Sequence, residues 1–362
     1  MRLLLKPALS RSWRDSETLQ LGTITRYAGV LDQADKTLCD FLGLVDGTRD
    51  RPALLEAGER IGLGREPADA LLTELEETGL LDDAESTDAA LARFPEPHRK
   101  LLGPDLASLS LVHSGPGAAP AVLARRADAR IEVRGAGRVG AAVAAVLAAG
   151  GAGAVSVADG GRVKAGDCSP AGLLPADVGR LRSTAAREAV QRAAARRLAP
   201  TARRSADDPP PDFVVLAPRD GSAAFAGGTY ETRLLLRAGV PHLYVGVVEE
   251  FGVIGPLVVP GVSACGHCLV LRREDEDAAW PRVLAQLANG GPGRARTPAC
   301  DTALATTVAG LAALHVQVYL DGGRPPSVDG WCEVSARDGM PRRLRLRGHP
   351  DCGCLWQPLS PA

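Results

Sequence analysis

The chain has 362 residues, 45% of them hydrophobic, and a formal net charge of −1. This length allows two or three domains, and the apolar fraction is high enough for a full core. A charge so near zero argues against a protein that binds nucleic acid or anionic membranes, because neither attraction would have charge behind it. No apolar run stands out as long enough to span a bilayer, and the charged N-terminus is not a signal peptide, so we expect a cytoplasmic protein.

Residues 1–84 are predicted to form one small domain of three strands and three helices. The strands are expected at 3–5, 18–21 and 28–31, and the helices at 36–44, 52–61 and 67–77. Glycines close to the ends of all three helices mark their stops. This order is similar to a winged helix-turn-helix. Residues 85–128 are mixed in pattern and contain several prolines and glycines, so we interpret them as a connecting segment.

Residues 129–362 alternate between strand and helix patterns. Strands are expected at 131–133, 154–157, 213–216 and 242–247, and helices at 141–149, 185–198 and 234–238. Alternation of this kind specifies an α/β domain with a mainly parallel sheet that is covered on both faces. Two further extended runs, at 253–258 and 342–347, flank a long apolar helix at 302–320.

A glycine-rich loop lies between the first of these strands and the helix that follows it. Its glycines are Gly135, Gly137 and Gly140, with Arg138 between them. Glycines at such a turn let the backbone approach a phosphate, and a helix N-terminus favours negative charge. Asp159 ends the next strand, where a carboxylate can hold ribose hydroxyls. The pattern fits an ATP enzyme as well as a nicotinamide or flavin enzyme, and the glycines also serve simply to pack the helix on the sheet.

Four cysteines form two close pairs that lie far apart in the sequence. They are Cys265 with Cys268, and Cys352 with Cys354. Thiolates at such spacings can point at one ion, and two pairs complete four sulfurs around a structural Zn²⁺. The second pair is tightly spaced, which leaves His349 open as the fourth ligand. The other interpretation is that these are ordinary buried thiols, since cytoplasmic cysteines are seldom disulfides.

These motifs occur in one order that resembles the ThiF/MoeB superfamily of ubiquitin-activating-type adenylyltransferases. The match runs from about residue 130 to 356 and includes the glycine loop, Asp159 and the cysteine pairs. The resemblance implies a Rossmann-like domain with a zinc-stapled C-terminal tail. It also implies a domain that binds ATP and Mg²⁺, adenylates a carboxylate and forms a homodimer.

The chain departs from that family at positions that handle phosphate. Gly161 stands where a second aspartate is usual, and residues 167–170 replace an Asn-Leu-x-Arg stretch whose arginine touches the triphosphate. Arg182 replaces a lysine, and Asp220 is the only nearby candidate for the Mg²⁺-binding aspartate. Because phosphoryl chemistry needs cations against developing charge, these losses are expected to slow adenylation on the order of 10³-fold. Arg138 and Arg182 are the residues that can substitute.

Residues 1 to about 80 resemble the PqqD-like peptide-recognition element of systems that modify ribosomally made peptides. The resemblance implies that a leader peptide adds as a strand beside the small sheet and packs on the third helix. A DNA-binding winged helix is one alternative, but acidic side chains on the third helix would meet phosphates with the wrong sign. These side chains are Glu66, Asp69, Glu74, Glu76 and Glu77. A plain dimerisation module is the other alternative.

The two parts together resemble the ThiF-like partner proteins of azole- and azoline-forming peptide synthetases. This resemblance implies that the chain binds the leader of a precursor peptide and presents the core to a separate YcaO-type cyclodehydratase. The first alternative is a true adenylyltransferase that uses the glycine loop, Asp159, Arg182 and Asp220. A nicotinamide-dependent enzyme is the third option, which the cysteine tail disfavours.

Overall fold

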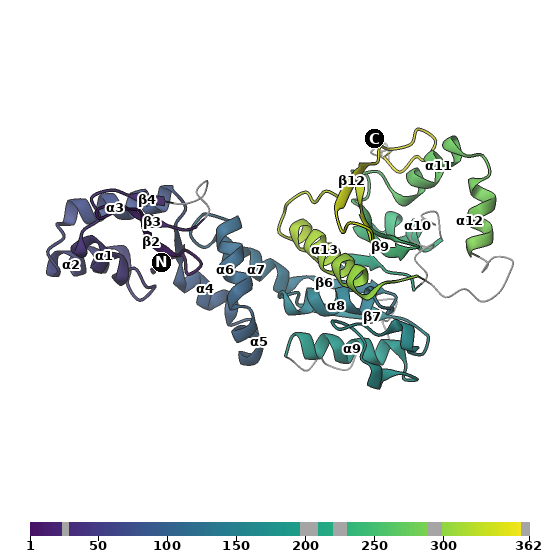
Figure 1. Cartoon of the computed structure of the whole chain (residues 1–362), viewed down its shortest axis with the longest axis horizontal. Helices are drawn as coiled ribbons and strands as arrows, with labels where there is room; N and C mark the ends of the chain where they lie inside the picture. Colours follow the sequence, from purple (N-terminus) through teal and green to yellow (C-terminus); the bar gives the residue numbers. More distant parts are fainter. Residues whose placement is uncertain (24–28, 196–208, 220–229, 289–298, 356–362) are drawn as a thin grey trace. The chain divides into compact units, whose positions relative to one another are not determined.

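The computed structural model describes residues 1–23, 29–195, 209–219, 230–288 and 299–355. The chain divides into two compact units, 1–127 and 128–362 (Figure 1). Each unit buries a hydrophobic core of its own, so the two are described separately.

The first part of the N-terminal unit contains the strands and helices that the sequence predicts. Its helices are α1 (Lys36–Leu44), α2 (Arg51–Arg60) and α3 (Arg65–Glu77). An antiparallel sheet joins β2 (Arg11–Trp13), β3 (Leu19–Leu21) and β4 (Gly29–Leu31), and β1 (Leu3–Leu5) pairs with β5 (Leu81–Asp83). Neither β2 nor β5 was expected. Each has only three residues, and β2 is wholly exposed and so carries no apolar alternation.

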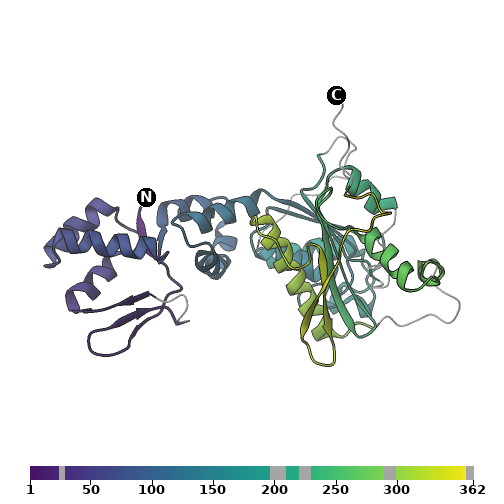
Figure 2. The same ribbon diagram turned by 90° about the horizontal axis from the view of Figure 1, so that it is seen from above.

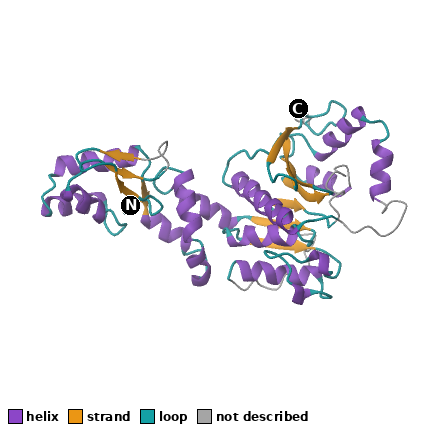
Figure 3. Ribbon diagram, viewed as in Figure 1, coloured by secondary structure: helices purple, strands orange, loops and turns teal. Residues whose placement is uncertain are grey.

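Residues 84–128 are helical, although the sequence suggested a connecting segment (Figure 3). They form α4 (Ala84–Leu91), α5 (Glu96–Leu101), α6 (Gly103–Val112) and α7 (Ala118–Asp128). These helices share a small core that includes Phe94, Leu102 and Leu123. Pro97 and Pro104 lie in first helical turns, where a missing N–H breaks no helical hydrogen bond. Proline therefore starts helices here instead of marking a linker.

The C-terminal unit is built on a seven-stranded sheet with the order β12-β11-β10-β9-β8-β6-β7. Its parallel strands are β6 (Arg130–Arg134), β7 (Ala154–Ala158), β8 (Phe213–Leu216) and β9 (His242–Val248). Its antiparallel strands are β10 (Phe251–Val258), β11 (Gly330–Ser335) and β12 (Pro341–Arg345). The sheet therefore contains the expected parallel part, together with an antiparallel part on the β9 side. The reason is local, since β10 follows β9 through a tight hairpin, and a hairpin forces antiparallel pairing.

Helices cover both faces of this sheet (Figure 2). One face carries α8 (Gly140–Ala149) and α13 (Thr302–Leu320), with α9 (Arg182–Ala193) packed beside α8. The other face carries α10 (Tyr230–Arg237) and α11 (Gly266–Glu276), which is followed by α12 (Trp280–Ala288). In β8, Phe213 and Val215 face the first layer while Val214 and Leu216 face the second. A strand buried on both sides needs an unbroken apolar run, as this one has.

By length and composition alone, helix α13 is long and apolar enough to cross a membrane. The helix was predicted with these bounds, 302–320, so what is corrected is the statement that no apolar run is long enough to span a bilayer. Its Leu304, Val308 and Val316 are buried in the main core, and the helix packs against β9 and β10. An apolar helix packed on a sheet in this way is explained as a core helix.

Candidate functional site

The glycine loop connects β6 to α8, and its three glycines have different surroundings. Gly135 has φ +107°, and a Cβ atom there would lie 2.0 Å from the Ala217 carbonyl oxygen. A Cβ atom at Gly140 would lie 2.1 Å from the Gly135 carbonyl oxygen. At Gly137 the nearest atoms, which belong to Arg219, are 3.5 Å away. Gly135 and Gly140 are therefore required by backbone packing, and Gly137 is the loop glycine at which a Cβ atom would make only ordinary van der Waals contacts.

A cavity of about 650 Å³ opens beside this loop. It lies at the carboxyl ends of β6, β8 and β9, where β6 pairs with β7 on one side and β8 on the other. Such a switch in strand order is where open α/β sheets bind ligands. The cavity wall includes Gly137, Arg138, Gly140, Lys164, Asp167 and Arg219. The predicted residues Gly135, Asp159 and Arg182 are not among the residues that line the cavity.

Asp159 follows β7, and its carboxylate oxygens accept hydrogen bonds from nearby backbone and side-chain donors. Its carboxylate accepts hydrogen bonds from the Ala136 N–H at 2.9 Å and the Gly161 N–H at 2.9 Å. It also accepts one from Nε of Arg182 at 2.9 Å. Burial alone would raise the pKa of Asp159, but Arg182 and the two amides outweigh it and lower the pKa below its usual value. Asp159 is thus an ionised anchor between the glycine loop and α9.

Arg182, the first residue of α9, is held between two carboxylates. Its Nη2 lies 2.8 Å from Asp159 Oδ1, and its Nη1 lies 3.6 Å from Asp167 Oδ2. The hydrogen bond to Asp159 is the main reason that the pKa of Arg182 is raised. A cation fixed in this way is paired before any ligand arrives.

Asp167 and Arg219 form an ion pair at the cavity wall that the sequence analysis did not anticipate. Asp167 ends the short helix η2 (Ala165–Asp167), and its side chain is 2% exposed. Nε of Arg219 donates to its Oδ1, and the Lys164 N–H donates to its Oδ2 at 2.8 Å. Arg219 comes just after β8, next to the position considered for a Mg²⁺ ligand. That position, Asp220, lies outside the described residues.

Arg138 lines the cavity, but its guanidinium group contacts the segment just before and at the start of α13. Nη1 donates to the Cys300 carbonyl oxygen at 2.6 Å and lies 3.2 Å from Thr302 Oγ1. Its Nε is buried and has no hydrogen-bond partner among the described residues. Arg138 thereby connects the glycine loop to the start of α13 through Nη1.

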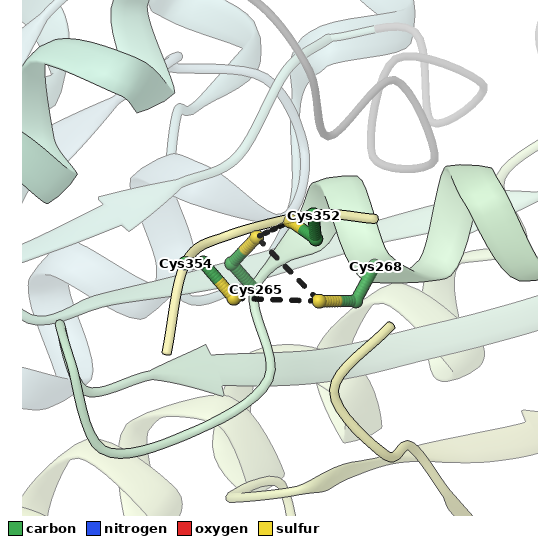
Figure 4. A group of neighbouring side chains, drawn as sticks. All are labelled: Cys265, Cys268, Cys352 and Cys354. Carbon is green, nitrogen blue, oxygen red and sulfur yellow. Dashed lines mark hydrogen bonds between the residues drawn. The ribbon is translucent and has the colours of Figure 1, made fainter. Parts of the chain in front are cut away.

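The four predicted cysteines lie together (Figure 4). Their sulfur atoms are all within 4.8 Å of one another, so the group can hold a metal ion. The Sγ–Sγ distance is 3.9 Å from Cys265 to Cys268, 3.4 Å from Cys265 to Cys352, and 3.4 Å from Cys268 to Cys354. A tetrahedral Zn²⁺ with Zn–S bonds of about 2.3 Å sets its sulfurs about 3.8 Å apart. The donor set and spacing fit zinc.

His349 lies near this cluster but is engaged elsewhere. Its Nε2 is 3.0 Å from Asp275 Oδ2, and its Nδ1 accepts a hydrogen bond from the Asp351 N–H at 3.1 Å. With both ring nitrogens occupied, four cysteines make a better ligand set than three cysteines and His349. Between the thiols themselves, a hydrogen bond raises the pKa of Cys265 and lowers that of Cys268.

Comparison with known proteins adds a family and a fold. The model of the ThiF family matches residues 118–355. No curated protein matches the chain in sequence. Among solved structures, E. coli MccB with ATP superposes with a TM-score of 0.66 at 16% identity, covering 98% of this chain and 99% of that one. MccB in complex with N-formylated MccA gives a TM-score of 0.66 at 16% identity, covering 98% and 100%.

The heterocyclase TruD is a further structural relative. It gives a TM-score of 0.59 at 19% identity, and the match covers 98% of this chain but 42% of the TruD chain. At identities this low, the likeness to MccB and TruD establishes the fold alone. The family follows from the match of residues 118–355, which cover more than half of the chain.

Proposed function

The chain belongs to the ThiF family, and we propose that it is a leader-peptide-binding partner protein in the biosynthesis of a ribosomally made, post-translationally modified peptide. In this role it presents the precursor to a separate YcaO-type cyclodehydratase and does little or no adenylation itself. The observation that carries the proposal is that acids of the chain already neutralise cations beside the pocket. Arg182 meets Asp159 and Asp167, and Arg219 meets Asp167.

Adenylation requires cations that are free to follow charge as it develops on the triphosphate. Arg182 would have to leave two carboxylates, and Arg219 one, before either could do so. Arg138 is directed at Cys300 and Thr302. Among the described cavity residues this leaves Lys164, which is too little to replace an arginine and a lysine of the family pattern.

The N-terminal unit supports the peptide-binding part of the proposal. Its small sheet ends in two short edge strands, β2 and β4. The β2 edge is beside α1, since Arg11 Nη2 donates to the Leu42 carbonyl oxygen at 3.0 Å. The β4 edge is beside the end of α3, since Leu80 lies against Gly29. A leader strand that also packs on α3 therefore fits the β4 edge.

The likeness to TruD supports a role in forming heterocycles on a peptide. TruD is a heterocyclase, and the match with this chain covers 42% of its length. In the proposal, the cyclodehydratase part is supplied by a second protein. The cysteine cluster holds a structural Zn²⁺ that fastens the chain after β12 to the start of α11.

The C-terminal unit pairs as a homodimer in this proposal. Light scattering of the purified protein tests the homodimer.

The test of the proposal is fluorescence anisotropy with the leader peptide encoded beside the gene. Full-length protein should bind it, and Val30→Asp on β4 should weaken binding at least about tenfold. Ser12→Asp is the matched control, because it adds the same charge to the exposed opposite edge strand, β2. It should change binding less than about twofold. Absence of binding to the wild-type protein rejects the proposal, and equal loss in both variants rejects the β4 edge.

A working adenylyltransferase is the second candidate, and the size of the cavity favours it. A space of about 650 Å³ beside a glycine loop and a helix N-terminus can accept a nucleotide. Pyrophosphate exchange into ATP distinguishes the two candidates. We expect no exchange above background. Robust exchange that disappears in Asp159→Ala would establish the enzyme instead.

A further inference from the structure

Asp167 is surrounded by the kind of groups that proteins use to hold phosphate. Two guanidinium groups, from Arg182 and Arg219, approach its carboxylate together with the backbone N–H of Lys164. Arginines combined with a backbone N–H are typical of phosphate sites. Asp167, Lys164 and Arg219 line the same cavity as Gly137 of the glycine loop. In this chain the two guanidinium groups are paired with the Asp167 carboxylate in place of a phosphate.

The charge arrangement decides which ligands the cavity tolerates. A phosphate placed in the cavity against Arg219 would stand next to the Asp167 carboxylate, whose side chain is 2% exposed. Like charges brought together in such a place repel strongly, and the arginines cannot satisfy both anions at full strength. Neutral ligands meet no such penalty.

We propose that Asp167 is a built-in substitute for phosphate and makes the cavity reject polyphosphates. This inference rests on the proposed function, because it gives a reason why the pocket of a leader-binding partner does not hold ATP productively. It also makes a separate claim, namely that one acidic side chain causes the rejection. Neutralising that side chain should restore a polyphosphate site.

Isothermal titration calorimetry of the full chain with adenosine, AMP, ATP and inorganic pyrophosphate, each with and without Mg²⁺, tests the claim. In the wild type, affinity should not rise from adenosine to ATP, and pyrophosphate should not bind. Asp167→Asn keeps the size of the side chain and removes its charge. It should bind ATP and pyrophosphate at least about tenfold more tightly than the wild type, with adenosine changed less than about twofold.

Asp177→Asn is the matched control. Asp177 is also buried, also ends a short helix, η3 (Pro175–Asp177), accepts a backbone N–H at 2.9 Å from Leu174 and pairs with Arg180 at 2.7 Å. It does not line the cavity. The control should therefore lose stability as Asp167→Asn does without gaining any affinity for phosphate.

Adding Arg219→Gln to Asp167→Asn should remove most of the gain, because the freed cation is then missing. Two results overturn the inference. One is a wild type that binds ATP more than tenfold more tightly than adenosine, which needs no variant to observe. The other is a folded Asp167→Asn protein with no gain for pyrophosphate, which would make the ion pair purely structural. Neither result bears on leader binding, so failure here is distinct from failure of the proposed function.

Discussion

A Cβ atom on Gly161 would lie 2.2 Å from Nη2 of Arg182. The guanidinium therefore occupies the space that a side chain at position 161 would fill, and from there it reaches Asp159 and Asp167. The two positions were noted in the sequence as separate departures from a family pattern. In the structure they depend on each other, because the arginine fits only above a residue without a side chain.

This dependence predicts a measurable coupling between the two positions. Gly161→Ala should destabilise the protein by about 1–2 kcal/mol, because the new methyl group displaces Arg182 from its carboxylates. In an Arg182→Lys background, whose side chain is shorter and unbranched, the same change should cost much less. Urea unfolding of the wild type, Gly161→Ala, Arg182→Lys and the double variant measures the coupling. Strictly additive costs would show that Arg182 moves aside freely and that the close approach carries no energy.

Asp159→Asn should cost about 2–4 kcal/mol at pH 7, because it leaves a half-buried guanidinium with weakened pairing. The folded-state pKa of Asp159 is lowered, so its contribution is present above the unfolded-state pKa of about 4 and is lost as pH falls through the folded value. The difference between wild type and variant should therefore shrink below pH 4. Urea unfolding at pH 7, 5 and 3 measures this difference.

Asp212→Asn is the control, because it removes the exposed partner of Arg130 and should cost less than about 1 kcal/mol. A wild-type to Asp159→Asn difference that stays constant down to pH 3 would contradict the assignment.

The sequence predicted well what depends on local pattern. The strand–glycine loop–helix unit and the apolar run of β8 were placed correctly, because burial on both sides of a sheet leaves a plain signature. The four cysteines were grouped correctly as well, since their chemistry restricts their geometry. The sequence could not show that Asp167 and Arg219 pair, because they lie in the loops after β7 and β8, which meet only when both strands pair with β6. It also missed that residues 84–128 fold, because their prolines look alike in a linker and in a first helical turn.

The cysteine cluster should contain one equivalent of zinc in the purified protein, measured by plasma mass spectrometry. Cys352→Ala, or prolonged treatment with a strong chelator, should remove the metal and lower the melting temperature by at least about 5 °C, since binding energy at such a site is folding energy. Cys332→Ala is the control, because Cys332 is a buried thiol in β11 outside the cluster. It should retain the metal. Full zinc content in Cys352→Ala would exclude Cys352 as a ligand.

Two buried histidines should make the protein less stable in mild acid. Desolvation lowers the pKa of His242 and of His315 to about 4, and the Val240 carbonyl only partly offsets this for His242. The unfolded chain therefore binds protons at these positions from about pH 6.5 downwards while the folded chain does not. The resulting stability is complete above pH 6.5 and is lost as pH falls towards 4.

Each histidine should account for about 1–2 kcal/mol of the loss between pH 6.5 and pH 5. His315→Gln keeps a polar group within reach of Ser327, which lies 3.0 Å from Nδ1 of His315. Chemical unfolding at both pH values should show a smaller loss in this variant than in the wild type. His113→Gln is the control, since His113 is only half-buried, at the end of α6, and unfolding of this variant is expected to follow that of the wild type. An identical loss in His315→Gln and wild type would mean that the ring is protonated in the folded protein without penalty.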